Sequence, residues 1–305
     1  MIKYTEKGNC MQRFKCKNCG GEFEISSHGE LVCPFCQSKQ YFTDKDFKGY
    51  DEFRDSLLKF LRVSNDQLVE KGDVLNLWDY NNKAVFETAD GNDVDIAYTF
   101  QTEVDGVKVY ISRENAVYVF DKSKKALAKK MYENLERLDY PSADIKNLKN
   151  FLPNLNLELE LKDGGLLVAF SKPENVYPLF AFSNLGPRHV AWMISRMENF
   201  ACLLEFNGMD FGHMDENNLF INPKTHEAYL LGGWWDVSAA GKAVALSALR
   251  QTAKRITGSR LAEGPKEYEE FLNSRPKSNA YDDFAAWDAV IEYGFGGHNF
   301  ANFES

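Results

Sequence analysis

Six cysteines occur in the 305-residue chain, and four of them have the spacing of a metal site. Cys16 and Cys19 enclose two residues, and Cys33 and Cys36 repeat this spacing after an interval of thirteen residues. Each C-x-x-C motif can present two thiolates from one tight turn, and two such turns complete a tetrahedral S₄ site. We therefore expect a structural zinc ion, because four protein ligands leave no coordination position for a substrate.

The residues between the cysteine pairs predict how this site is built. Segments 22–25 and 30–32 alternate polar and apolar residues as strands do, and the Ser-Ser-His-Gly sequence at 26–29 favours a turn. The sequence therefore predicts a zinc ribbon over residues 1–45, in which these two segments pair as a hairpin.

Composition restricts the partners that the whole protein surface can bind. The net charge of −9 argues against nucleic acid as a partner of the entire surface, because phosphate binding needs clustered Lys and Arg. No apolar run approaches the roughly 20 residues of a membrane helix, and the N-terminus lacks the apolar segment of a secretory signal. We expect a cytoplasmic protein without a membrane partner, in which Cys10 and Cys202 are thiols that do not bind the metal, and in which the two cysteine pairs are not disulfides.

A second polar stretch lies at residues 211–218, which read Phe-Gly-His-Met-Asp-Glu-Asn-Asn. It ends directly before the apolar segment 219–221. An Asn-Pro turn at 222–223 and a second apolar segment at 228–231 predict a β-hairpin. The hairpin is followed by Gly-Gly-Trp-Trp at 232–235. The two tryptophans could stack on a ligand or fill a core, and the core is the commoner use of such a pair.

The elements that must position this stretch follow from hydrophobic periodicity. A segment with two prolines, 171–179, separates a part rich in alternating patterns from a part rich in helical patterns. Strands are expected at 94–100, 107–111, 116–120, 155–161 and 166–170, and helices at 51–63, 124–138, 187–206, 243–256, 266–273 and 281–293.

This layout resembles the protein-kinase fold. In that family the catalytic loop reads His-Arg-Asp, four residues and Asn, and the following hairpin ends in Asp-Phe-Gly. Three strands, one helix and two further strands are also the order of the kinase N-lobe. The resemblance implies an α+β protein with a linker helix and a β-rich N-lobe at 46–172, and a helical C-lobe at 173–305.

The loop can be aligned with the family pattern in two registers. Anchoring on Asn218, next to the strand, places His213 where the family has its catalytic base and Phe211 where the family has its His. In this register Gly232-Gly233-Trp234 occupies the position of Asp-Phe-Gly. We favour this register, because the alternative His213-Met214-Asp215 anchor places Phe220 where the magnesium-binding Asn belongs.

The other charged groups that the family needs are also missing from their expected positions. The strand at 116–120 is apolar at its centre, and Lys122 falls at its end. On the following helix, the apolar face leaves Glu133 and Glu136 toward solvent. A chain without the base, the metal carboxylate and the strand Lys is expected to be a pseudokinase. His213, Asn218 and Trp234 remain as contacts of unknown role, and binding of ATP and magnesium is not expected.

A weaker resemblance is to uncharacterised kinase-like proteins of large tailed bacteriophages. These proteins also show an Asn-Leu-Phe-type strand and a Gly-Gly-Trp-Trp end. We expect a binding or regulatory module directed at a protein partner, which would be a host factor in the host cytoplasm if the source is a virus.

Two other functions stay open at the level of the sequence. An atypical phosphotransferase would use the second register, with Asp215 as base and Asp236 as metal ligand. A nucleic-acid-associated regulator would use a basic face of the zinc ribbon, whose basic residues include Arg13, Lys15, Lys17 and Lys39.

Overall fold

The computed structural model describes residues 12–16, 18–19, 22–25, 29–42, 82–173, 176–222 and 226–298. These residues belong to two compact units, a small one that holds the four clustered cysteines and a large one that holds residues 82–298. The helix expected over 51–63 and the thiol of Cys10 lie outside the described residues.

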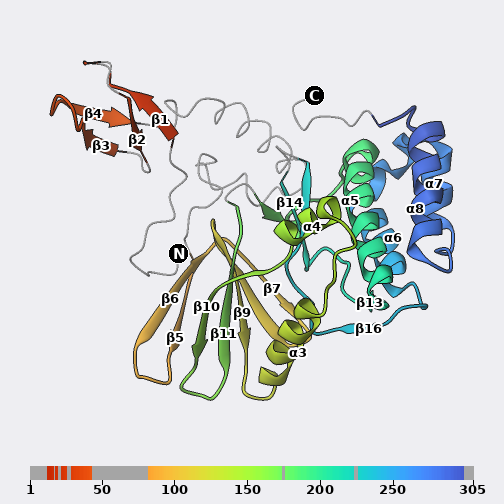
Figure 1. Cartoon of the computed structure of the whole chain (residues 1–305), viewed down its shortest axis with the longest axis horizontal. Helices are drawn as coiled ribbons and strands as arrows, with labels where there is room; N and C mark the ends of the chain where they lie inside the picture. Colours follow the sequence, from red (N-terminus) through yellow and green to blue (C-terminus); the bar gives the residue numbers. More distant parts are fainter. Residues whose placement is uncertain are drawn as a thin grey trace. The chain divides into compact units, whose positions relative to one another are not determined.

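The small unit consists of two short antiparallel strand pairs (Figure 1). Strand β1 (Gln12–Lys15) pairs with β2 (Glu22–Ile25), and β3 (Gly29–Val32) pairs with β4 (Lys39–Phe42). The predicted pairing of β2 with β3 is therefore wrong. Each cysteine pair forms the connection within one strand pair, so the partner of each strand lies across its own metal-binding turn.

The large unit begins with a small sheet that the sequence did not predict as such. Strand β5 (Asn82–Glu87) pairs with β6 (Asp93–Tyr98), and β7 (Phe100–Val104) then enters a different sheet. The single strand expected here is broken at Thr99, whose N–H donates to the carbonyl of Ile111 at 3.0 Å. The alternation of apolar residues continues across this break, so periodicity alone did not reveal it.

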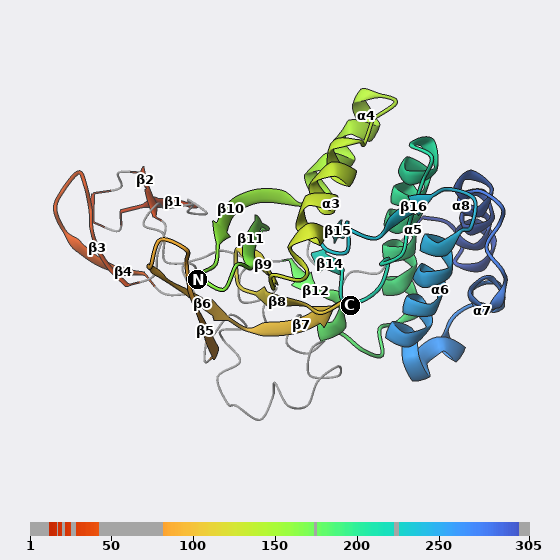
Figure 2. The same ribbon diagram turned by 90° about the horizontal axis from the view of Figure 1, so that it is seen from below.

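A five-stranded antiparallel sheet follows, in the order β10-β11-β9-β8-β7. After β7 come β8 (Val107–Ile111), β9 (Asn115–Phe120), helix α3 (Lys125–Glu136), β10 (Asn154–Glu160) and β11 (Leu166–Ser171). The predicted order of three strands, one helix and two strands is confirmed, and it is the order of a kinase N-lobe. Helix α3 packs against β9 and β11 (Figures 1 and 2).

Burial explains why the sheet has this order. All six residues of β9 are buried, as expected for a strand with a neighbour on each side and a helix on one face. The edge strand β10 alternates instead, with Leu157 and Leu159 packed toward a core that includes Val117 and Leu167. Between α3 and β10 lie the short α4 (Ala143–Lys146) and the 3₁₀ turn η2 (Asn147–Phe151).

Helices dominate the rest of the large unit, where they gather together (Figure 2). Helix α5 (Pro187–Phe206) has the predicted bounds, with Pro187 at its first position and Gly208 at φ +64° just beyond its end. The elements that follow it are α6 (Val244–Thr257), η4 (Gly258–Glu263), α7 (Lys266–Asn273), α8 (Ala280–Ala289) and η5 (Val290–Gly294). Helix α5 packs against α6 and α8.

Short strands hold the polar loop between these helices. The predicted hairpin is confirmed as β14 (Leu219–Asn222) paired with β15 (Glu227–Leu230), and β12 (Tyr177–Pro178) pairs with the other edge of β14. The turn η3 (Leu179–Ala181) follows β12. Strand β13 (Met209–Phe211) pairs with β16 (Val237–Ala239), so both ends of the loop and hairpin segment are tied together. Within the described residues, no helix is long and apolar enough to cross a membrane.

Candidate functional site

The four clustered cysteines have the geometry of a tetrahedral metal centre. Their sulfur atoms all lie within 4.8 Å of one another. The Sγ atoms of Cys16 and Cys36 are 3.6 Å apart, and those of Cys19 and Cys33 are 3.8 Å apart. A zinc ion with Zn–S bonds of about 2.3 Å requires sulfur separations of about 3.8 Å in a tetrahedron. The predicted ligand set therefore fits structural zinc.

Hydrogen bonds around the sulfur atoms favour their thiolate form. The N–H groups of Asn18 and Cys19 donate to the Cys16 sulfur at 3.4 Å, and the hydroxyl of Ser38 lies 3.0 Å from the Cys36 sulfur. Burial opposes ionisation of Cys16, but the amides of Cys19 and Asn18 outweigh it and lower the pKa of the thiol to about 5. Metal binding needs thiolates, so these turns are prepared for a cation.

In the large unit, Asn218 occupies the position that the favoured register assigns to it, directly before β14. It is fully buried, and its side-chain amide donates to Oδ1 of Asp215 at 3.0 Å. The same Oδ1 accepts the N–H of Asn217 at 2.9 Å. One carboxylate oxygen of Asp215 therefore holds the loop in shape, which is a common use of Asp in turns.

His213 lies at the centre of three carboxylates. Its Nε2 is 2.8 Å from Oδ2 of Asp105 and 3.7 Å from Oδ2 of Asp236, and its Nδ1 is 3.5 Å from Oδ2 of Asp215. Burial disfavours the imidazolium, but the hydrogen bond to Asp215 and the charge of Asp105 outweigh it and raise the pKa of His213. A histidine surrounded by carboxylates therefore stands where the kinase pattern has its basic carboxylate.

Asp105 comes from a distant part of the chain, the turn between β7 and β8. Its Oδ2 accepts hydrogen bonds from Nε2 of His213 and from the indole Nε1 of Trp235, each at 2.8 Å. In the kinase fold this turn covers the nucleotide phosphates. In this protein the Asp105 carboxylate, at the tip of the turn, contacts the loop that contains His213. The sequence gives no sign of this contact, because an Asp before a Gly between two strands has the pattern of an ordinary turn residue.

The position of the missing metal carboxylate is filled by a tyrosine. A Cβ atom on Gly232 would lie 2.4 Å from Oδ1 of Asn218 and 2.7 Å from the hydroxyl of Tyr118. Tyr118 comes from the centre of β9, the strand that was expected to offer only apolar side chains, and its hydroxyl is buried. The residues present therefore do not fit a magnesium site. Among the described residues, the four clustered cysteines are the one group of three or more His, Cys, Asp or Glu side chains whose ligand atoms lie close enough together to hold a metal ion.

Both tryptophans after the hairpin are buried in a core, whereas the core interpretation expected one indole inward and one at the surface. The ring of Trp235 packs edge-on against Phe120 and Tyr118, with ring centroids 5.7 and 6.2 Å apart. The indole of Trp234 donates to the carbonyl of Leu230 at 3.0 Å. Together they fill the space between the five-stranded sheet and the loop.

Helix α3 contributes an amide to this region and no carboxylate. The side chain of Asn134 is buried and donates to the carbonyl of Trp234 at 2.8 Å. Glu133 and Glu136 are exposed, as expected, and Lys122 is exposed after the end of β9. Asn134 was not predicted as a site residue, although its position three residues after the buried Met131 places it on the packed face of the helix.

Asp236 is the most exposed of the three carboxylates around His213, with about half of its side chain exposed. Its backbone carbonyl accepts the N–H of Gly212 at 3.1 Å, and a Cβ atom on Gly212 would lie 2.0 Å from its Oδ2. The structure thus brings both residues of the second register, Asp215 and Asp236, to the same histidine.

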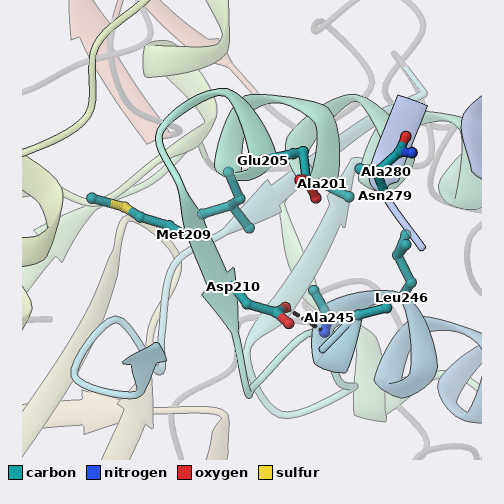
Figure 3. Close-up of a pocket in the computed structure, with 10 residues that line it drawn as sticks. Ala201, Glu205, Met209, Asp210, Ala245, Leu246, Asn279 and Ala280 are labelled. Atoms are coloured by element: carbon teal, nitrogen blue, oxygen red, sulfur yellow. Dashed lines mark hydrogen bonds between the residues drawn. The ribbon is translucent and has the colours of Figure 1, made fainter. Parts of the chain in front are cut away.

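A small cavity lies elsewhere, where the ends of α5, α6 and α8 meet (Figure 3). Alanine side chains line much of this partly open cavity, and its volume of about 10 Å³ leaves room for about one water molecule. Asp210 lines the cavity and caps α6 by accepting the N–H groups of Val244 and Ala245 at 2.8 and 2.9 Å. These contacts give Asp210 a structural role.

Comparisons with known proteins agree with this description. A family model that describes a zinc ribbon domain matches residues 11–40. No curated protein matches the chain.

Three solved structures illustrate what the chain is similar to. The first is the ROP18 kinase domain in complex with AMP-PNP and sucrose, with 10% identity, a TM-score of 0.46, and coverage of 78% of this chain and 92% of that one. The second is vaccinia related kinase 3, with 14% identity, a TM-score of 0.38, and coverage of 70% and 79%. The third is WbdD, with 9% identity, a TM-score of 0.43, and coverage of 64% and 46%. The chain spans about half the length of the WbdD structure. By its strand order and its cysteine cluster, the chain is a kinase-like α+β protein with an N-terminal zinc ribbon.

Proposed function

We propose that this protein is a catalytically inactive kinase-like module that acts by binding another macromolecule. The observation that carries the proposal is the filling of the site by the chain itself. The Tyr118 hydroxyl lies against Gly232, where a metal carboxylate is needed, and the Asp105 carboxylate lies against His213, where a base is needed.

Phosphoryl transfer depends on positioning charges and on a metal that neutralises the phosphates. At this site the groups that face the loop are carboxylates, a phenol and indoles. Asp105, Asp215 and Asp236 would repel a polyphosphate, and His213 is the basic side chain that contacts all three. These negative charges support the proposal that the site does not bind a nucleotide.

Two measurements test the loss of activity. We expect the melting temperature of the zinc-loaded protein to be unchanged by ATP with or without magnesium, because a ligand of the folded state must raise it. Phosphate transfer to the protein itself or to a general acceptor protein should be absent. Asp215→Asn and Asp236→Asn serve as matched variants, and loss of a measurable activity in either one would establish the phosphotransferase alternative.

The zinc ribbon supports a protein partner. Phe35 lies in the second cysteine turn with 64% of its surface exposed, and the nearby Val32 is 49% exposed. Large apolar side chains on a small module are typical of contact surfaces. The four clustered cysteines are placed to bind a metal, and such a site suits a reducing compartment such as the cytoplasm, or the host cytoplasm for a viral protein.

The test for a protein partner replaces the exposed Phe35 of the zinc ribbon and compares the proteins that co-purify. Phe35→Ser should keep the zinc content and the melting temperature but lose proteins that co-purify with the wild type. Phe206→Ser, an exposed phenylalanine in the large unit, is the matched control and should retain them. Equal retention by the two variants would place the partner site outside the ribbon, and salt-sensitive recovery of nucleic acid would favour the nucleic-acid alternative.

A further inference from the structure

Three hairpin turns of the described part of the large unit contain an Asp-Gly pair, and in one of them the Asp side chain bonds residues outside its own hairpin. Asp90 bonds Thr88 and Asn92 within its turn, and Asp163 accepts the N–H of Gly165 at 2.8 Å. Asp105 instead turns its carboxylate onto the loop that follows α5. The Asp90 and Asp163 side chains therefore stabilise their own turns, whereas the Asp105 side chain also bonds residues distant in sequence.

The contacts of Asp105 join two halves of the large unit. Its Oδ2 accepts hydrogen bonds from His213 and Trp235, each at 2.8 Å. Two strand residues from the same hairpin support this contact. Thr102 donates from its hydroxyl to Oδ1 of Asn217 at 2.9 Å, and the ring of Phe100 packs edge-on against Phe180 at 6.2 Å.

The charges that face His213 come from three segments. Asp105 belongs to the β7–β8 turn, Asp215 to the loop of His213 itself, and Asp236 to the segment before β16. Two cations act on these carboxylates from further away, since Lys124 lies beside the turn and Arg255 of α6 is attracted to Asp215. The phenol of Tyr118, buried on β9, stays neutral.

We propose that the β7–β8 turn is a proton-controlled latch, in which the Asp105 carboxylate holds the sheet against the polar loop as long as His213 carries its proton. The latch goes beyond the proposed function, because it stands whether the protein binds a partner or transfers a phosphate. Opening it would release the turn and expose the indole edge of Trp235 to solvent.

The sign of the pH effect follows from the two partners. Hydrogen bonds and opposite charge raise the pKa of His213 in the folded protein, so the stabilisation is fully present below its ordinary pKa and is lost as the pH rises through the raised value. Burial opposes ionisation of Asp105, but the bond from Trp235 and the charge of His213 lower its pKa overall. The negative charge of Asp105, which the latch also needs, is therefore lost only in acidic solution. The latch closes in mildly acidic solution and loosens in mildly alkaline solution.

The test measures the coupling between the two residues at two pH values. Hydrogen exchange of residues 100–111 reports opening of the turn in the full-length, zinc-loaded protein. The variants are Asp105→Asn, His213→Gln and the double variant. Asn tolerates the positive φ of 54° at position 105, and Gln keeps a donor without a charge. Asp163→Asn is the matched control, because the Asp163 carboxylate accepts its hydrogen bond from Gly165 in its own turn.

At about pH 6, where the histidine is charged, we expect each latch variant to speed exchange of this segment by roughly tenfold or more, with no further gain in the double variant. At about pH 9 the difference from the wild type should shrink severalfold. The control should match the wild type at both values. Equal coupling at the two pH values, or additive effects of the two substitutions, would overturn the proposal. If His213→Gln does not fold, the wild type and Asp105→Asn compared at the two pH values decide the question alone.

Discussion

The α-carbon of Gly232 faces the hydroxyl of Tyr118 so closely that a Cβ atom at position 232 would lie 2.7 Å from that oxygen. The two residues come from different halves of the large unit, one from β9 and one from the end of the β14–β15 hairpin. Their contact leaves no room for a side chain at the position where the kinase pattern has its metal carboxylate.

A first prediction concerns this contact. Gly232→Ala should lower the free energy of unfolding by about 1–3 kcal/mol, because the added methyl group overpacks a buried site. Denaturant titration measures the change. Gly186→Ala is the control, since its nearest neighbours are the flexible end of Arg260, and it should change stability much less. Similar values for the two variants would show that position 232 has more space than described.

A second prediction concerns the hydroxyl of Tyr118, whose removal should not lower the free energy of unfolding. It is buried and has no hydrogen-bond partner within the described part of the chain. Burying an unpaired hydroxyl costs about 1–3 kcal/mol, so Tyr118→Phe should leave the protein as stable as the wild type or more stable. Tyr268→Phe is the matched control, because the Tyr268 hydroxyl bonds Thr257 at 2.8 Å and its loss should destabilise. Clear destabilisation by Tyr118→Phe would indicate an undescribed bond to that hydroxyl.

Removal of zinc should unfold the small unit and spare the large one. Small metal ribbons take most of their folding energy from the metal. A chelator, or Cys16→Ser, should therefore abolish zinc retention in native mass spectrometry but leave the melting transition of the large unit in place. Cys202→Ser should retain zinc. A fall of the main transition on zinc removal would contradict independent folding of the two units.

Acid should release the metal in a defined range. The pKa of Cys16 is lowered to about 5 by the amides of Cys19 and Asn18, which overcome burial. A lowered pKa keeps the thiolate present above that value and loses it as the pH falls through it. Metal affinity should therefore decline as the solution is acidified, which a competition titration with a chromogenic chelator measures. Ser38→Ala, which removes a hydroxyl beside the Cys36 sulfur, should move the release to higher pH.

The helical part holds a carboxylic acid whose effect on stability depends on pH. Burial and the nearby Asp283 raise the pKa of Glu198 to about 9. A raised pKa favours the fold at low pH, and this contribution is lost as the pH rises toward 9, at a rate of about 1.4 kcal/mol per unit. Glu198→Gln should leave stability near pH 4 unchanged and increase it by on the order of 3 kcal/mol at pH 7. Parallel stability curves for the two proteins would contradict a protonated Glu198.

Local patterns predicted the elements of this fold well. The spacing of cysteines located the metal ligands, and the apolar periodicity with a proline start and a glycine end located α5 to the residue. Pairing was harder to predict. Strand alternation continues through Thr99, where the chain changes sheets, and nothing in residues 22–32 distinguishes a partner upstream from a partner downstream.

The candidate site was only partly predictable, because its key contacts join residues distant in sequence. Asn218 and His213 could be placed from their distance to a strand. Asp105 lies 108 positions before His213 and has the same local signature as Asp163, an Asp before Gly in a hairpin. Tyr118 looks like any aromatic residue of a buried strand until the glycine opposite it is known.

The fit between Gly232 and Tyr118 also restricts the paths that mutation can take. A carboxylate gained at position 232 has no space until the phenol is replaced by something smaller, and a smaller residue at 118 leaves a void until position 232 is filled. A change at position 232 taken first is therefore harmful, whereas loss of the Tyr118 hydroxyl taken first is not, so the order of the two changes matters. Under the proposed function, selection can modify the rest of the surface for binding, while a carboxylate at position 232 has to wait for a change at position 118.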